Sequence, residues 1–143
     1  MSPEYPERPV PAVAGVVFRG DDVLLVKRGH APNRGRWSVP GGAVEDGETV
    51  EGAVAREVLE ETSVRVRPIR VLAVVDLVER DDGGRIRFHY ATVQVLCEYV
   101  EGEPMPDSDA ENARWIPVRE LHEYDVTETA LRVIQAALKE RGP

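Results

Sequence analysis

Three carboxylates in one short stretch of the chain have the spacing of a shared site. Glu57 and Glu61 are four residues apart and Glu60 is three beyond Glu57, so on a helix all three side chains project from one side. Like charges at this spacing repel one another, and a cation, protonation or a basic partner relieves the repulsion. Carboxylate oxygens suit Mg²⁺ or Mn²⁺, with substrate phosphates completing the shell. A solvated acidic face is the alternative interpretation.

The helix that would carry these carboxylates is predicted over residues 49–61, which contain no proline and many helix formers. Its apolar residues recur at i, i+3, i+4 and i+8: Val50, Ala53, Val54 and Val58. The carboxylates border this apolar stripe, where a merely solubilising patch would be wasteful. Upstream, the Pro-Gly-Gly sequence at 40–42 predicts a bare backbone turn that can approach a metal or a phosphate closely, because glycine has no side chain.

The remaining segments predict an α/β protein with two helices on a mixed sheet. Residues 1–10 are rich in proline and predict an extended arm, and residues 11–143 predict a single domain. Strand signals fall at residues 10–18, 23–26, 64–78, 86–100 and 114–116, with turns at 19–22 and 81–84. The last helix follows a capping box in which Asp125 is the N-cap. The order strands, helix, strands, helix suggests helices packed on the faces of the sheet.

Charge and composition exclude several classes of function. A net charge of -8 repels a phosphate backbone, so a nucleic acid polymer is not an expected partner, whereas a small anionic nucleotide can bind through a divalent cation. No apolar stretch has the length of a membrane span and no secretory signal pattern is present, so we expect a cytoplasmic protein with no membrane partner. The single cysteine, Cys97, is expected in the core. A homodimer is the default expectation for the oligomeric state.

The residues around the carboxylates resemble the Nudix box, whose pattern is G-x5-E-x7-R-E-U-x-E-E-x-G-U with U aliphatic. The matching residues are Gly42, Glu48, Arg56, Glu57, Val58, Glu60, Glu61 and Val64. Ser63 stands where the family usually has glycine, just past the helix, where a left-handed residue often closes the last turn. We therefore expect a slightly altered helix exit and retained activity. The resemblance extends over residues 10–140 and implies the family's α/β/α sandwich.

The resemblance also implies an activity, which is hydrolysis of a nucleoside diphosphate linked to another moiety by attack of water on the pyrophosphate. Clustered Mg²⁺ ions, or Mn²⁺, would neutralise the phosphates and lower the pKa of a bound water. The metal ligands it implies are Glu57, Glu60, Glu61 and the carbonyl of Gly41. Glu57 is also a candidate for the base that takes the proton of the water. Arg56 is expected to orient the cluster by bonding Glu48 or Glu60.

An additional acid from outside the box is common in this family, supplied by a loop that faces the helix. Glu111 is the candidate here, with Asp107 and Asp109 behind it. The alternative is that these acids only solubilise a loop that contains proline.

Candidates for substrate binding lie elsewhere in the chain. Arg28 and Arg36 are expected to bind the diphosphate or the second moiety through fork-like hydrogen bonds, with ordinary surface arginines as the alternative. Tyr90 is a candidate for stacking on a base.

Three interpretations of the function are open. A pyrophosphatase of the ADP-ribose or nucleotide-sugar kind is favoured by the general character of the loops and strands. A sanitising pyrophosphohydrolase that acts on modified nucleoside triphosphates is the first alternative. A Nudix-like module that senses a nucleotide without cleaving it is the second, although such a module would be expected to lose one or more acids of the box. The expected ligand in each case is a small nucleotide.

Overall fold

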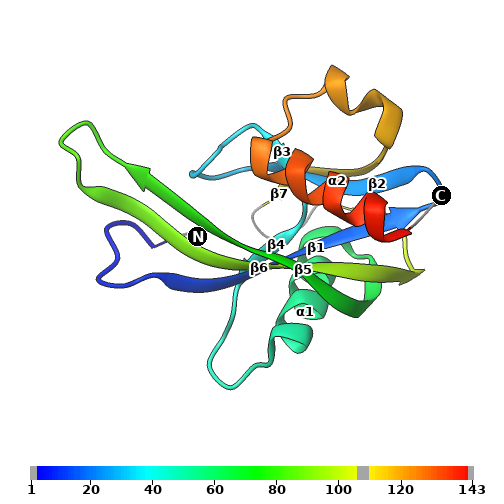
Figure 1. Ribbon diagram of the computed structural model, residues 1–143, viewed down its shortest axis with the longest axis horizontal. Helices are drawn as coiled ribbons and strands as arrows, with labels where there is room; N and C mark the ends of the chain where they lie inside the picture. The colour runs from blue at the N-terminus through cyan, green and yellow to red at the C-terminus, as the bar shows by residue number, and fades with distance from the viewer. Residues whose placement is uncertain (1–2, 106–109, 142–143) are drawn as a thin grey trace.

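A mixed seven-stranded sheet lies between two helices, with α1 on one face and α2 on the other (Figure 1). The computed structural model describes residues 3–105 and 110–141, with the side chains of all but Ala110 and Glu111. The elements are β1 (Val10–Arg19), β2 (Asp22–Arg28), β3 (Trp37–Ser38), β4 (Gly41–Ala43), α1 (Val50–Thr62), β5 (Arg65–Arg80), β6 (Ile86–Glu101), β7 (Ala110–Pro117), the 3-10 helix η1 (Val118–Glu123) and α2 (Glu128–Arg141). This arrangement confirms the predicted α/β/α sandwich.

Strand β1 is shared by two parts of the sheet. Its last residues pair antiparallel with β2, where Phe18 lies opposite Val23. Its first half pairs antiparallel with β4, where Ala14 lies opposite Gly41. On its other side β1 runs parallel to β6, beginning with the pair Val10 and Tyr90. One strand therefore joins the hydrophobic core to the two glycines that precede α1.

Two hydrophobic clusters, one on each face of the sheet, hold the helices. On the α1 face, Val54 packs with Val13 and Val17 of β1. On the α2 face, Ile134 packs with Val16. Alternate residues of β1 thus face opposite helices. Burial on both sides explains why this strand is an almost continuous run of apolar residues.

Helix α1 has a defined cap at each end. Thr49 precedes it, and its Oγ1 accepts a hydrogen bond from the N–H of Gly52 at 3.0 Å. Ser63 follows it in the left-handed conformation, with φ of 66°, and its N–H donates to the carbonyl of Leu59 at 2.9 Å. The predicted helix is confirmed with each end shifted by one residue. The serine adopts the backbone conformation that glycine adopts at lower cost.

Two predictions about short segments are wrong. Gly41 and Gly42 do not form a turn, because both pair with β1 as part of β4. Asp125 is not the N-cap of α2, because Thr127 Oγ1 accepts the hydrogen bond from the N–H of Ala130 at 3.2 Å. In both cases the local sequence is compatible with the prediction, and pairing with another strand decides the structure: Gly41 and Gly42 pair with β1, and Val126 pairs with Trp37 of β3.

The N-terminal arm contacts the hairpin formed by β5 and β6. The N–H of Tyr5 donates to the carbonyl of Arg87 at 2.7 Å, and its hydroxyl donates to Asp81 Oδ2 at 2.9 Å. The guanidinium of Arg85 lies 4.3 Å from the centre of the Tyr5 ring. These contacts place the arm on the surface of the hairpin, before β1 begins at Val10.

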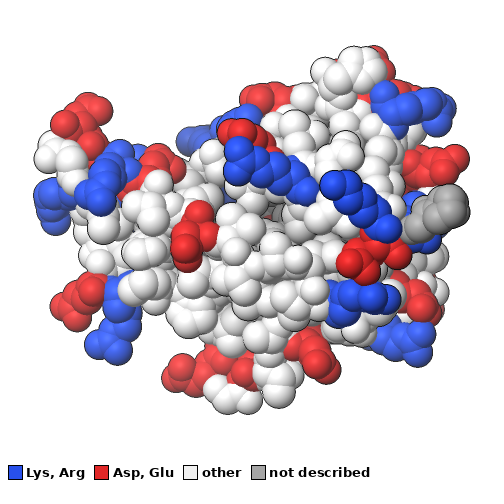
Figure 2. Space-filling model, viewed as in Figure 1, with Lys and Arg blue, Asp and Glu red and all other residues white. Residues whose placement is uncertain are grey.

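Strand β5 forms one edge of the sheet and exposes apolar side chains: Ile69, Val71, Val74 and Val78. Figure 2 shows a largely uncharged area in the middle of the view, where β5 runs in Figure 1. The expected homodimer stays a prediction. Within the described ranges, no helix is both long and apolar enough to cross a membrane.

Candidate active site

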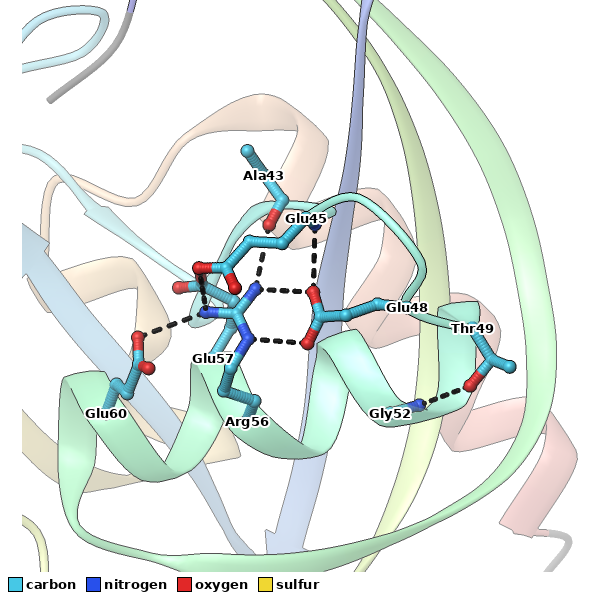
Figure 3. Close-up of polar contacts among 8 residues, drawn as sticks. All are labelled: Ala43, Glu45, Glu48, Thr49, Gly52, Arg56, Glu57 and Glu60. Carbon is cyan, nitrogen blue, oxygen red and sulfur yellow. Dashed lines mark hydrogen bonds and ion pairs between the residues drawn. The ribbon is translucent and has the colours of Figure 1, made fainter.

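One arginine on α1 binds the acidic residues that surround it (Figure 3). Arg56 Nε and Nη2 donate to the two carboxylate oxygens of Glu48, at 2.6 and 2.8 Å. Its Nη1 donates to Glu57 Oε1 at 2.8 Å and to Glu60 Oε2 at 3.1 Å. Its Nη2 also donates to the carbonyl of Ala43 at 3.0 Å. Arg56 therefore binds both of the glutamates that the sequence offered as alternatives, and it joins β4 and the loop after it to the helix.

Burial and the arginine shift the pKa values of two carboxylates in opposite directions. The Arg56 guanidinium, helped by the N–H of Glu45, lowers the pKa of Glu48 to about 2. Loss of hydration in the largely buried position of Glu57 raises the pKa of that carboxylate, although Arg56 opposes the shift. The two carboxylates in turn raise the pKa of Arg56, which stays charged. Glu57 is therefore better suited than Glu48 to accept a proton.

The two glycines of β4 leave room for the carboxylates of α1. The N–H of Gly41 donates to Glu61 Oε1 at 2.8 Å, and Glu61 is buried. A side chain at Gly42 would collide with the carboxylate of Glu57, and one at Gly41 would collide with the backbone of Val13. Gly42 is thus closely approached by helix α1 and Gly41 by strand β1, while the expected approach to a metal or a phosphate stays a prediction.

The carboxylates line a cleft of about 380 Å³, a volume within the range of pockets that bind small molecules. Glu57, Glu60 and Glu61 line it together with Gly41 and Gly42. Other parts of its wall come from β1, β5, β6, the loop after β2 and the start of α2, including Ala14, Pro32, Leu77, Tyr90, Gln94 and Thr129. The acidic cluster is thus one part of a larger ligand-sized space.

Comparison with known protein families identifies the family of this chain. The family model for the NUDIX domain matches residues 8–137. The chain belongs to the Nudix family. An ADP-ribose pyrophosphatase of Methanocaldococcus jannaschii is 34% identical over 113 residues, which are 79% of this chain and 64% of that protein. The NAD-capped RNA hydrolase NudC of Pseudomonas syringae is 33% identical over 140 residues, 96% of this chain and 47% of that protein. The chain spans less than two thirds of the length of both relatives.

Solved Nudix structures share the fold. A MutT NUDIX hydrolase from Burkholderia pseudomallei superposes with a TM-score of 0.79 at 29% identity, covering 91% of this chain and 98% of that one. The NUDIX domain of Shewanella oneidensis NrtR, solved with ADP ribose, superposes with a TM-score of 0.74 at 22% identity, covering 94% and 89%. These similarities confirm the family and the fold that the motif implied.

The donor atoms of the Nudix box fit a hard divalent cation, because every one of them is an oxygen. Among the described side chains, which do not include that of Glu111, no three acidic, histidine or cysteine residues stand close enough together to hold an ion as they are. Arg56 binds Glu57 and Glu60, and the N–H of Gly41 binds Glu61. A cation would therefore have to replace part of these hydrogen bonds.

The structure brings two of the three predicted substrate-binding residues to the Nudix cleft. Arg28 and Tyr90 line it. Arg28 Nε donates to the carbonyl of Pro32 at 2.6 Å, which fixes the side chain against the loop after β2. Arg36 is not part of the lining, because its Nε donates to Asp125 Oδ1 at 3.2 Å instead. That ion pair connects the loop to the segment before α2.

The other predictions for the site concern β7 and the loop before it. Glu111 belongs to β7, and its side chain is not described; Asp107 and Asp109 lie outside the described residues. Sequence reasoning missed Thr92 and Gln94, which line the cleft from β6. Their polar side chains at alternate positions of the otherwise apolar segment 91–97 were the available signal.

Proposed function

We propose that this Nudix protein hydrolyses the pyrophosphate bond of a nucleoside diphosphate linked to another moiety, of the ADP-ribose or nucleotide-sugar kind, with Mg²⁺ or Mn²⁺. One observation carries the proposal. Glu57 is largely buried, is paired with Arg56 and is packed against the bare backbone of Gly42 in a ligand-sized cleft. The pyrophosphatase name of the archaeal relative supports the substrate class.

The proposed reaction is attack of water on one phosphorus of the pyrophosphate. A divalent cation, when bound, neutralises phosphate oxygens and makes water more acidic. Glu57 takes the proton, because burial raises its pKa and makes it a stronger base than an exposed carboxylate. A P–O bond forms to the water oxygen, the P–O bond to the bridging oxygen breaks, and the leaving phosphate departs as an anion.

The neighbouring residues hold these groups in place. Arg56 orients Glu57 through Nη1, and Glu48 fixes Arg56 by binding its other two nitrogens. The proposed oxygen ligands of the cation are the carboxylates of Glu57, Glu60 and Glu61 and the carbonyl of Gly41.

Three further residues have proposed roles away from this cluster. The positive charge of Arg28, which lines the cleft, suits the diphosphate. The Tyr90 ring offers an apolar surface to the rest of the substrate. Glu111 is the proposed additional acid.

Nucleotide release from a panel of substrates tests the proposal. The panel contains ADP-ribose, nucleotide sugars, and ordinary and oxidised nucleoside triphosphates, each with Mg²⁺ and again with EDTA. Glu57→Gln and Glu61→Gln should lower turnover by about 10² or more. Glu123→Gln, at an exposed position of η1, is the matched control and should retain it.

The products decide between the interpretations. A nucleoside monophosphate with a phosphorylated sugar supports the proposal. A nucleoside monophosphate with pyrophosphate, from triphosphates alone, would establish the sanitising activity in its place. Tight nucleotide binding with no turnover of any compound would establish a sensing module.

A further inference from the structure

A residue that lines the cleft carries a buried polar atom with no hydrogen-bond partner in the described part of the chain. Gln94 of β6 is only 3% exposed, and its Oε1 makes no hydrogen bond to any described residue. The same residue lines the cleft that the carboxylates share. A buried acceptor without a donor costs free energy, and native proteins rarely leave one in place without a reason. A ligand that brings a donor into the cleft would supply the missing hydrogen bond.

The residues that pair with Gln94 on the neighbouring strands have short side chains. In the sheet, Gln94 lies between Ala14 of β1 and Ala73 of β5. Ala14 lines the cleft as well. Directly opposite residues on neighbouring strands point to the same face, so short side chains flank the amide on both sides. In this row, Gln94 is therefore the one long polar side chain between two short ones.

The row of residues that contains Gln94 also leads to the carboxylates. Gly41 pairs with Ala14, and Ala14 pairs with Gln94. Two strand spacings separate Gly41 from Gln94, roughly 10 Å. The N–H of Gly41 is bound to Glu61. A nucleotide with its phosphates at the carboxylates thus has its nucleoside within reach of Gln94.

We propose that Gln94 is a specificity residue whose Oε1 accepts a hydrogen bond from an N–H or O–H group of the nucleoside part of the substrate. This inference rests on the proposed function for the position of the phosphates. The donor is either the exocyclic amine of a base or a hydroxyl of the ribose. The polarity of the site then selects nucleosides that carry the donor and rejects analogues that lack it.

Equilibrium binding of the common nucleoside 5′-monophosphates in the presence of Mg²⁺, measured by calorimetry, tests the role of Gln94. Gln94→Met keeps the length of the side chain and removes both polar groups. It should weaken binding of the preferred monophosphate by about tenfold and leave Tm unchanged or higher. Gln135→Met, at an exposed position of α2, is the matched control. Gln94→Asn, which retracts the amide, replaces Gln94→Met if that variant does not fold.

Analogues of the preferred nucleotide identify the donor. Each analogue lacks one group: the exocyclic amine, the 2′-hydroxyl or the 3′-hydroxyl. The analogue that lacks the donor should bind the wild type more weakly than the parent nucleotide does. The parent nucleotide and this analogue should bind Gln94→Met with equal affinity, as in a double-mutant cycle. Equal binding by wild type and variant, no coupled analogue, or no binding of any monophosphate would overturn the proposal.

Turnover separates this inference from the function on which it rests. If the wild type hydrolyses a substrate and Gln94→Met binds the nucleotide as tightly as the wild type does, only the role of Gln94 is contradicted. Coupled binding at Gln94 without hydrolysis of any compound in the panel contradicts the proposed function and retains the nucleoside site.

Discussion

Arg56 and Glu48 form a two-point ion pair, with Nε and Nη2 of the arginine 2.6 and 2.8 Å from the two carboxylate oxygens of the glutamate. Both hydrogen bonds are charge-assisted, and together they fix the plane of the guanidinium. The remaining nitrogen, Nη1, then points at Glu57 and Glu60. Glu48 therefore influences the cleft through Arg56.

Glu48→Gln should lower kcat about tenfold and leave KM nearly unchanged, because it removes the charge that orients Arg56. Steady-state kinetics on the best substrate of the panel measures both constants. Glu51→Gln, at an exposed position in the first turn of α1, is the control and should match the wild type. An unchanged kcat in Glu48→Gln would show that Arg56 keeps its orientation without the pair.

Acid should remove the contribution of Glu48 to stability. Arg56 and the N–H of Glu45 lower the pKa of Glu48 from 4.5 to about 2 in the folded protein. A carboxylate with a depressed folded-state pKa stabilises above its unfolded-state pKa, and this stability is lost as the pH falls through the folded value. The Tm difference between wild type and Glu48→Gln should be constant above about pH 5 and shrink from about pH 4.5 to 2. Thermal unfolding followed by circular dichroism measures it, and a difference that grows in acid would contradict this prediction.

Gly42→Ala should reduce turnover by about 10² while the protein stays folded, because the new methyl group collides with the carboxylate of Glu57. Turnover and the circular dichroism spectrum are measured on the same preparation. Gly83→Ala, in the turn between β5 and β6 where a methyl group has an ordinary contact, is the matched control. Normal turnover in Gly42→Ala would mean that Glu57 works equally well in a displaced position.

Ser63→Gly should stabilise the protein by roughly 1 kcal/mol and leave activity unchanged. Ser63 has a φ of 66°, a left-handed conformation that glycine adopts without strain. A rise in Tm of a few degrees is expected from differential scanning calorimetry. A large gain in catalytic rate would instead show that the helix exit limits the reaction.

The thiol of Cys97 should be unreactive in the folded protein. Burial raises its pKa to about 12, and the thiolate rather than the thiol is the nucleophile. At neutral pH an aromatic disulfide reagent should not react with the native protein, and the single cysteine of the chain should react once the protein is unfolded in guanidinium. Fast reaction of the native state would reveal local opening of β6.

Sequence reasoning succeeds at α1 because its signals are local. The spacing of Glu57, Glu60 and Glu61 and the apolar periodicity beside it lie within a few turns of one helix. The same reasoning fails at Gly41, because a strand of three residues has no periodicity of its own and is defined by its pairing with Ala14.

Long-range contacts account for the other differences between the sequence-based predictions and the structure. Arg36 reads as a substrate-binding arginine, and its partner Asp125 is 89 residues away. In the sequence, Gln94 is one of two polar residues in the otherwise apolar segment 91–97. Its burial depends on its hairpin partner β5 and also on β1, which is far from β6 in the sequence. Such contacts have no counterpart in local spacing or composition.

Strand β1 belongs to both the cleft and the protein interior, so the two should unfold together. It pairs with β4 beside the carboxylates and continues between the two helices. Central strands of this kind open only when the whole domain opens, and their amide hydrogens are among the last to exchange with solvent. Heat should therefore not separate the carboxylates of the cleft from an intact scaffold, and the proposed activity and the cooperative structure should be lost at the same temperature. The thermal inactivation curve should then coincide with the unfolding curve.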